Sequence, residues 1–357
     1  MSWFLAFAAF AALIVLHEFG HFIAAKAVGM RVEKFSLFMP PTVASVRRGE
    51  TEYAIGALPL GGYVKITGMN PEEDIPPDVL PRAYFNQPVW KRIVVIAAGP
   101  AVNVLIAFVL VFILFAWVGV SETSKSVAGV DKGAAAAGVI QPGDRLVSIN
   151  GKDGDPLTLS REIDRSQCRD KRVDGCRATK PIEVSVIRDG KLQKVQVTPR
   201  YDAKVKRMRL GFTFGRERKR ESLDNAFSST TSGIWRVTKL TVALPARIFD
   251  SEKRKEISSA VGGYETTRQA VQRDWELTIQ IIALISLSLA IINLFPFLPL
   301  DGGHIFWALV EKVRGGRPVP IAWMARASVI GIGLIAMLFL IGLSNDIDRF
   351  RNGGFGP

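Results

Sequence analysis

Two histidines and a glutamate near the start of the sequence have the types and spacing of a metal site. His17 and His21 are four positions apart, so a helix places both imidazoles on one face, with Glu18 beside them. Zinc accepts two histidines plus a carboxylate and leaves a fourth position for water, whose pKa it lowers toward ~7. Glu18 could then take the proton as a general base. The alternative is three polar residues at a membrane boundary without a metal.

Asp301 is the candidate for the third protein ligand. It lies in the stretch N-L-F-P-F-L-P-L-D-G-G-H, in which Pro296 and Pro299 break the helix and two glycines allow close backbone approach. Broken backbone at membrane depth is tolerated where it lines a cavity or is buried in protein. His304 is the last of the three histidines, and it is either an alternative ligand or a structural or outer-shell residue. Asn293 is either a buried amide that satisfies a carbonyl or a residue that faces a substrate.

The apolar residues, 48% of the chain against 22% charged, are gathered in blocks. Residues 1–16, 94–121, 277–300 and 327–345 contain no charge, and the first block qualifies as a span if it continues through residue 25. A membrane-spanning helix needs about 20 apolar residues. We therefore expect a polytopic α-helical membrane protein with four transmembrane helices. This pattern excludes a simple soluble enzyme and an intrinsically disordered chain.

The net charge of +13 is concentrated in residues 204–220 and beside the apolar blocks. Such basic flanks favour contact with anionic headgroups over nucleic-acid binding. Short loops rich in Lys and Arg stay cytoplasmic, which predicts that both termini and the long segment between spans two and three lie outside. Spans one and three then run inward, so the histidine motif and Asp301 reach the same cytoplasmic side.

These observations predict a division of the chain into nine segments. The boundaries are 1–30 for the first span, 31–90 for a membrane-associated β-region, 91–120 for the second span, 125–202 for an exterior domain, 203–276 for exterior amphipathic segments, 277–310 for the third span, 311–326 for a cytoplasmic loop, 327–345 for the fourth span and 346–357 for an exterior tail. Cys168 and Cys176 both fall in the exterior domain, where an oxidising compartment would let them pair. The alternative is two unpaired thiols on a loop.

Three motifs in this order resemble the site-2 proteases, which are intramembrane zinc metalloproteases, and most closely the bacterial regulator of sigma-E protease type. They are H-E-F-G-H at 17–21, G-P-A-V-N at 99–103 and N-x-x-P-x-x-P-L-D-G-G-H at 293–304. The resemblance covers nearly the whole chain. It implies one zinc ion held by His17, His21 and Asp301, with Glu18 as general base and Asn293 in contact with the substrate backbone.

The polar segments also resemble parts of that family. Residues 57–65 are similar to its membrane-associated β-region, and there Gly61, Gly62 and Tyr63 would bind an unwound substrate by strand addition. A hairpin that only plugs the cytoplasmic mouth is the alternative. Residues 126–200 resemble a circularly permuted PDZ domain, with a helix near 157–165 and a hairpin around 189–190. Such a domain either binds a peptide end or screens out bulky exterior domains.

Together these features predict a zinc-dependent intramembrane endopeptidase of the bacterial inner membrane. Its expected substrates are single-span membrane proteins, either anti-sigma factors in regulated intramembrane proteolysis or leftover signal peptides. The expected partners are these substrates, peptides at the PDZ-like domain and the lipid bilayer, with no nucleic acid. Two other readings are a non-catalytic scaffold that captures peptides and a zinc transporter with the same ligands.

Overall fold

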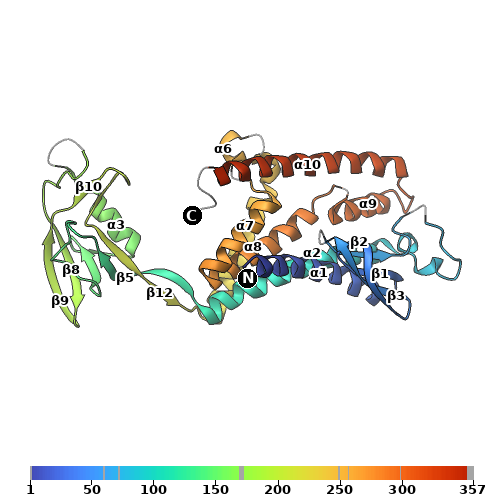
Figure 1. Ribbon diagram of the computed structural model, residues 1–357, viewed down its shortest axis with the longest axis horizontal. Coiled ribbons are helices and arrows are strands. Elements are labelled where there is room, and N and C mark those ends of the chain that lie inside the picture. The colour runs from blue at the N-terminus through green and yellow to red at the C-terminus, as the bar shows by residue number, and fades with distance from the viewer. Residues whose placement is uncertain are drawn as a thin grey trace. The chain divides into compact units, whose positions relative to one another are not determined.

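The computed structural model describes residues 2–351 except 59–60, 71–72, 169–172, 248–249, 256 and 298. Pro59 and Leu60 of the predicted β-region, Leu298 before the Asp301 motif and residues 352–357 of the predicted exterior tail therefore lie outside the described part. The chain forms two units, one made of Met1–Ala116 with Ser222–Pro357 and the other of Trp117–Glu221 (Figure 1). Each unit is described by itself.

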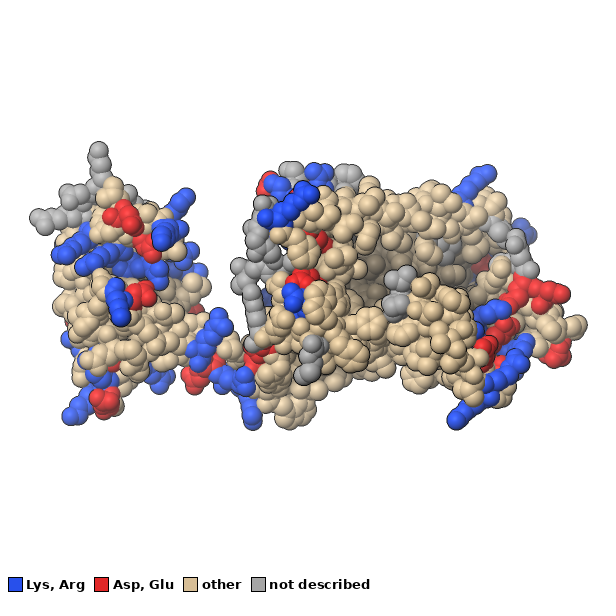
Figure 2. All heavy atoms as spheres, viewed as in Figure 1, with Lys and Arg blue, Asp and Glu red and all other residues tan. Residues whose placement is uncertain are grey.

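Four helices of the first unit are long and apolar enough to cross a membrane, in agreement with the four predicted spans. They are α1 (Ser2–Ala27), α2 (Val89–Ile113, continued by a π-helical turn, Leu114–Val118), α8 (Trp275–Asn293) and α10 (Ile321–Arg351). A helix satisfies every backbone polar group within its own segment, which a lipid environment requires. Figure 2 shows the charged side chains of this unit gathered toward its two ends, with a broad uncharged belt between them.

The third predicted span, 277–310, is not one helix. α8 ends at Asn293, and a separate helix, α9 (Asp301–Val313), begins after a short irregular segment. Pro296 and Pro299 explain the break, because each lacks the N–H that a continuous helix would donate. The fourth span is longer than predicted, since α10 continues past 345 through Asp346 to Arg351.

A four-stranded sheet follows α1 in the first unit. Its strands are β1 (Val32–Leu37), β2 (Met39–Arg48), β3 (Thr51–Leu58) and β4 (Tyr63–Ile66), in the order β2-β3-β1-β4. β1 pairs with β3 in parallel, whereas β2–β3 and β1–β4 are antiparallel. Val32 and Ile66 pack with Val95 and Ile96 of α2 in one buried cluster, so this core fixes the sheet against the helices. Two 3₁₀ turns, Leu80–Arg82 and Tyr84–Asn86, lead from the sheet to α2.

An ion cluster joins the end of α1 to the β2–β3 turn. Arg82 donates two hydrogen bonds to Glu50, at 2.7 and 2.8 Å, and Lys26 donates a third at 2.8 Å. These bonds from Arg82 and Lys26 hold the pKa of Glu50 at about 2. The carboxylate therefore stays charged, and it holds the sheet beside the last turn of the helix that carries His17 and His21.

The second half of the first unit adds short helices between the spans. These are α4 (Leu223–Val242), α5 (Leu244–Arg247), α6 (Ser251–Arg254) and α7 (Ala260–Arg273). α4 and α7 correspond to the amphipathic helices predicted within 203–276. Ile234 and Val237 of α4 pack against Ala107, Leu287 and Ile291 of α2 and α8. This packing covers one side of the spans that flank the metal site.

The second unit is built on an antiparallel sheet. Its elements are β5 (Val120–Val130), β6 (Arg145–Ile149), β7 (Lys152–Asp153), α3 (Pro156–Asp164), β8 (Ile182–Arg188), β9 (Lys191–Val197), β10 (Arg200–Asp202), β11 (Arg207–Arg209) and β12 (Phe212–Lys219). The main sheet has the order β12-β5-β6-β8-β9. Asp189 and Gly190, with φ of 49° and 75°, form the predicted turn between β8 and β9. The structure joins Cys168 and Cys176 in a disulfide, with Cα atoms 5.9 Å apart.

The predicted boundary of the exterior domain at 202 is wrong. The unit continues to Glu221, because β12 pairs with β5 and forms one edge of the sheet. Phe212 and Phe214 pack against the buried core of the unit around Leu146 and Val184. Residues 204–220 are rich in Lys and Arg, so the sequence there does not show the regular alternation of apolar residues that indicates a strand.

Asp346 of α10 fastens that helix to the start of α7. Its carboxylate is fully buried and accepts hydrogen bonds from Ser258 Oγ at 2.8 Å, from Ser259 N and Oγ at 2.8 and 2.7 Å, and from Gly262 N at 3.1 Å. No Cβ fits at Gly262, because it would overlap this carboxylate. This multiply bonded acid therefore holds α10 at this end, together with hydrogen bonds from Asn345 to Arg254 O and from Arg349 to Lys255 O.

We predict that Asp346→Ala lowers the free energy of unfolding by about 3 kcal/mol, because several buried donors lose their acceptor together. Fluorescence-monitored thermal unfolding in detergent measures the change. Asp348→Ala, two positions further along the same helix at an exposed site, is the matched control and should leave the midpoint unchanged. Equal shifts in the two variants would contradict the role of Asp346.

Candidate metal centre

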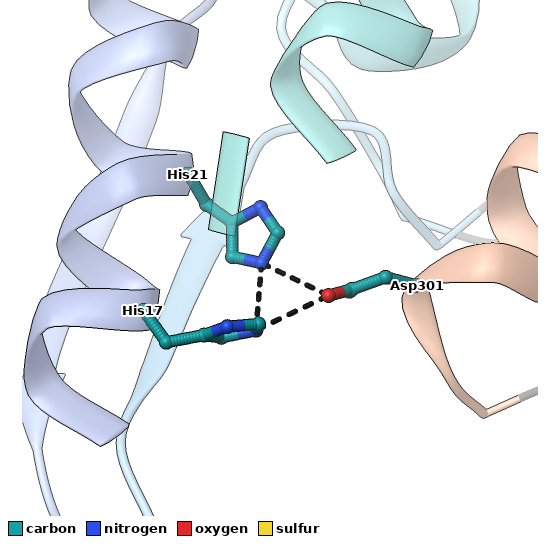
Figure 3. Close-up of side chains that lie close together, drawn as sticks. All are labelled: His17, His21 and Asp301. Carbon is teal, nitrogen blue, oxygen red and sulfur yellow. Dashed lines mark hydrogen bonds and ion pairs between the residues drawn. The ribbon is translucent and has the colours of Figure 1, made fainter. Parts of the chain in front are cut away.

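Three side chains from two separated helices meet at one point, as predicted (Figure 3). His17 and His21 project from α1, and Asp301 is the first residue of α9. Asp301 Oδ2 lies 3.1 Å from His17 Nε2 and 3.3 Å from His21 Nε2, and the two Nε2 atoms are 3.3 Å apart. The histidines are 5% and 7% exposed, so the triangle lies within the protein and not on its surface.

The spacing of these three atoms fits a zinc ion. Ligand atoms ~2.0–2.1 Å from a tetrahedral ion lie ~3.3 Å from one another, and two imidazole nitrogens with one carboxylate oxygen are a donor set that zinc accepts. Neutral His21 has its proton on Nδ1, which donates to Val95 O, so its Nε2 carries a lone pair and cannot donate a hydrogen bond to Asp301 Oδ2. A cation at its centre satisfies all three lone pairs at once.

The helix α2 makes room for the triangle. A Cβ at Gly99 would overlap the imidazole of His21, so only glycine fits there. At Gly20, a Cβ would lie 2.7 Å from Ala98 O and 2.9 Å from Val102 Cγ2, which shows how closely α1 approaches α2. The same requirement applies at Gly302, where a Cβ would overlap the backbone at Leu294. Glycines thus permit both the helix contact and the turn that presents Asp301.

Hydrogen bonds on the far side of the ligands orient them. His21 Nδ1–H donates to Val95 O at 2.8 Å, which leaves Nε2 as the ligand atom. His17 Nδ1 lies 3.1 Å from Asn103 Nδ2. Both neighbours belong to α2, and the sequence analysis assigned neither of them a role. The G-P-A-V-N motif was the signal that could have found Asn103.

An ion pair fixes α9, and with it Asp301. Arg92 of α2 donates two hydrogen bonds to Glu311, from Nη1 to Oε2 at 2.9 Å and from Nη2 to Oε1 at 2.6 Å. Arg92 is only 7% exposed, and a bidentate ion pair of this kind fixes the relative orientation of the guanidinium and the carboxylate. The pair was not foreseen from the sequence, because 219 positions separate its members.

The candidate base lies on the β4 side of the triangle. A Cβ at Gly62 would be 3.2 Å from Glu18 Cγ, and the backbone of Val64 lies near the Glu18 carboxylate. Tyr63, the first residue of β4, pairs with Ser36 of β1. Gly62 and the start of β4 are thus placed next to Glu18, and Gly61 directly precedes them.

Two other predicted residues lie near the triangle without being part of it. Asn293 Nδ2 is 3.5 Å from His17 Nε2, at the end of α8. His304 is half-buried one turn into α9, and the ligand cluster among the described residues does not include it. Cys168 and Cys176, which form the disulfide, belong to the other unit.

We predict that Gly99→Ala lowers the zinc content to near zero, because the added methyl group displaces the His21 imidazole. Metal analysis of protein purified in detergent measures this. Gly233→Ala is the control, since a Cβ at that helical glycine meets nothing within 4 Å. Full zinc occupancy in Gly99→Ala would show that His21 is not held as described.

Comparison with known proteins agrees with this chemistry. The family described as Peptidase family M50 matches residues 5–340. A protein of Nostoc sp. (strain PCC 7120) is 32% identical over 352 residues, covering 95% of this chain and 93% of its own. A protein of Brucella suis is 29% identical over 364 residues, covering 94% and 92%, and one of Clostridium acetobutylicum is 28% identical over 356 residues, covering 97% and 98%. Each of the three carries the name "putative zinc metalloprotease".

The match confirms the resemblance to the site-2 protease family and zinc as the cofactor. It extends over nearly the whole chain, and the chain presents a donor triangle that suits the metal named in its relatives. This protein therefore belongs to peptidase family M50, and it is a zinc-dependent metalloendopeptidase.

Proposed function

We propose that this peptidase cleaves peptide bonds within the transmembrane segments of single-span membrane proteins. The observation that carries the proposal is the position of the metal triangle. His17 and His21 lie inside α1, a helix apolar enough to cross a membrane, and Asp301 reaches them through the break after α8. A site at this depth meets substrates that are themselves in the membrane. Regulated intramembrane proteolysis, such as cleavage of an anti-sigma factor, and clearance of signal-peptide remnants both require such a site.

Glu18 is the general base of the proposed reaction. Zinc, when bound, acts as a Lewis acid that polarises the scissile carbonyl and makes water more acidic. Glu18, one residue from His17, takes a proton from the attacking water and delivers it to the leaving amine. The Asn293 amide, close to His17, holds the substrate backbone by hydrogen bonding. These roles involve Glu18, Asn293 and the three candidate ligands, and they leave His304 and Asn103 without a part in the reaction.

A substrate helix must open locally before its peptide bond can be attacked. Among the described strands β4 is the last of its sheet, so its outer edge pairs with no further described strand and could accept an added one. Gly62 and Val64 lie against Glu18, so a segment paired with β4 passes the base. We propose that Gly61, Gly62 and Tyr63 receive the unwound substrate here. In the alternative, the sheet only plugs the mouth of the site.

Glu18→Gln should keep zinc and lose cleavage by at least ~10²-fold, because the amide binds no proton at neutral pH while both histidines remain. Asp301→Ala should lose both zinc and cleavage. Zinc content and cleavage of a model single-span substrate are measured on the same purified protein. Substantial cleavage by Glu18→Gln would remove the general-base assignment. Zinc without cleavage in the wild type, tested on several spans, would count against the proposed substrates.

We propose that the second unit is a PDZ-like domain that binds a peptide end. A cavity of about 760 Å³ lies between α3 and the β11–β12 region, and it is lined by Leu157, Ile163, Leu210 and Phe214 among others. Arg161 and Arg207 also line it. The neighbouring β12 is an edge strand, so a peptide can pair with it and place an apolar side chain in the cavity. Such a domain favours substrates already shortened outside the membrane.

We place the protein in the bacterial inner membrane, with both termini and the PDZ-like unit in the periplasm and the metal centre toward the cytoplasm. Basic residues follow α1 and precede α2, as short cytoplasmic loops require. The Cys168–Cys176 disulfide suits an oxidising compartment such as the periplasm. The remaining partners are the lipid bilayer and the substrates, with no nucleic acid.

Leu157→Lys should weaken binding of a peptide with an apolar C-terminus by about tenfold or more, because a charge replaces an apolar wall of the cavity. Leu192→Lys is the matched control, since Leu192 is similarly exposed on β9 at the opposite edge of the same sheet. Fluorescence anisotropy with a labelled peptide measures the affinity. Equal affinities for the two variants would contradict peptide binding at this cavity.

A further inference from the structure

One face of α2 contacts both metal-binding histidines of α1. Val95, Gly99 and Asn103 follow one another at intervals of four positions, which places them on the same side of the helix. Val95 supplies the carbonyl that orients His21, and Gly99 leaves space for that ring. Asn103, the last residue of the G-P-A-V-N motif, lies against His17. The proposed mechanism gives Asn103 no task, although it is fully buried in the apolar part of the protein.

We propose that Asn103 is a positioning residue for the metal ligand His17. Its side-chain oxygen accepts a hydrogen bond from His17 Nδ1–H and so holds the neutral imidazole in the tautomer whose Nε2 lone pair faces the metal. A metal-bound histidine almost always donates its other N–H to such an acceptor. The inference rests on the zinc site and not on the identity of the substrate.

The orientation of the Asn103 amide follows from the geometry of His17. Nε2 points at Asp301 and His21, so it is the ligand atom, and the ring proton must then be on Nδ1. Nδ2 of Asn103 lies 3.1 Å from His17 Nδ1, so in this orientation of the amide two N–H donors would face each other. A carboxamide turned by 180° has nearly the same shape, and its orientation is assigned from hydrogen bonding. Oδ1 is buried and has no hydrogen-bond partner in this orientation, and the turn brings it to His17 Nδ1.

The backbone at Asn103 is held from the other side. Ser286 Oγ of α8 donates to Asn103 O at 2.9 Å, and both residues are fully buried. This contact fixes the helix position without touching His17. Ser286→Ala therefore disturbs the packing around Asn103 while leaving the amide in place.

The test is zinc affinity, measured by chelator competition on the purified full-length protein. Asn103→Leu should weaken zinc binding by roughly 10–100-fold, because the leucine has a similar size but accepts no hydrogen bond. Asn103→Asp should retain affinity within a few-fold of the wild type, because a carboxylate oxygen can accept from Nδ1–H. Ser286→Ala should bind zinc like the wild type. Substitution of cobalt for zinc gives a visible spectrum that reports the ligand geometry, and only Asn103→Leu should alter it.

Two results would overturn the proposal. One is wild-type zinc affinity in Asn103→Leu. The other is an equal loss in the Leu and Asp variants, since that would mean the amide acts in helix packing alone. If Asn103→Leu does not yield folded protein, Asn103→Ala replaces it in the same comparison with Asn103→Asp. Thermal unfolding of the metal-free proteins separates a loss of affinity from a loss of fold.

Discussion

The structure depends on the burial of two imidazoles and a carboxylate inside an apolar helix bundle. Polar groups at that depth are costly unless a neighbour satisfies them. His21 is held by the Val95 carbonyl, His17 lies against Asn103, and both face Asp301. α2 therefore does more than cross the membrane, because it carries the groups behind the ligands. The close contact of α1 and α2, made possible by glycine, is a condition for the site.

The position of Asp301 also requires that α8 ends before it. Asp301 reaches the histidines because α8 ends at Asn293 and a new helix starts at the aspartate itself. The buried pair of Arg92 with Glu311 then fixes the direction of α9. Removing Glu311 would leave the buried Arg92 guanidinium without its partner, so the pair restricts the position of α9 even where its net contribution to stability is small. Irregular backbone at this depth is tolerable because it lies beside the site it serves.

In the proposed reaction, the sheet beside α1 brings a substrate backbone to the metal centre. Gly62, directly before β4, and Val64 within it lie beside Glu18, and the Glu50 ion cluster holds the β2–β3 turn near the end of the same helix. The base and the strand edge are therefore positioned by one helix. In the proposed reaction this arrangement lets an unwound segment meet the general base in an extended conformation, which a helical substrate cannot do.

The sequence alone determined the parts of this protein that local periodicity encodes. Helical spacing placed His17, Glu18 and His21 together, the uncharged blocks located the spans, and the prolines before Asp301 predicted the break. Only the tertiary structure decided the parallel pairing of β1 with β3, the inclusion of β12 in the second unit and the contact of Asn103 with His17. The Arg92–Glu311 pair and the Asp346 cluster belong to the same class, since they join residues 219 and 84 to 88 positions apart. Such contacts leave no local pattern, because they depend on which faces the folded helices present to one another.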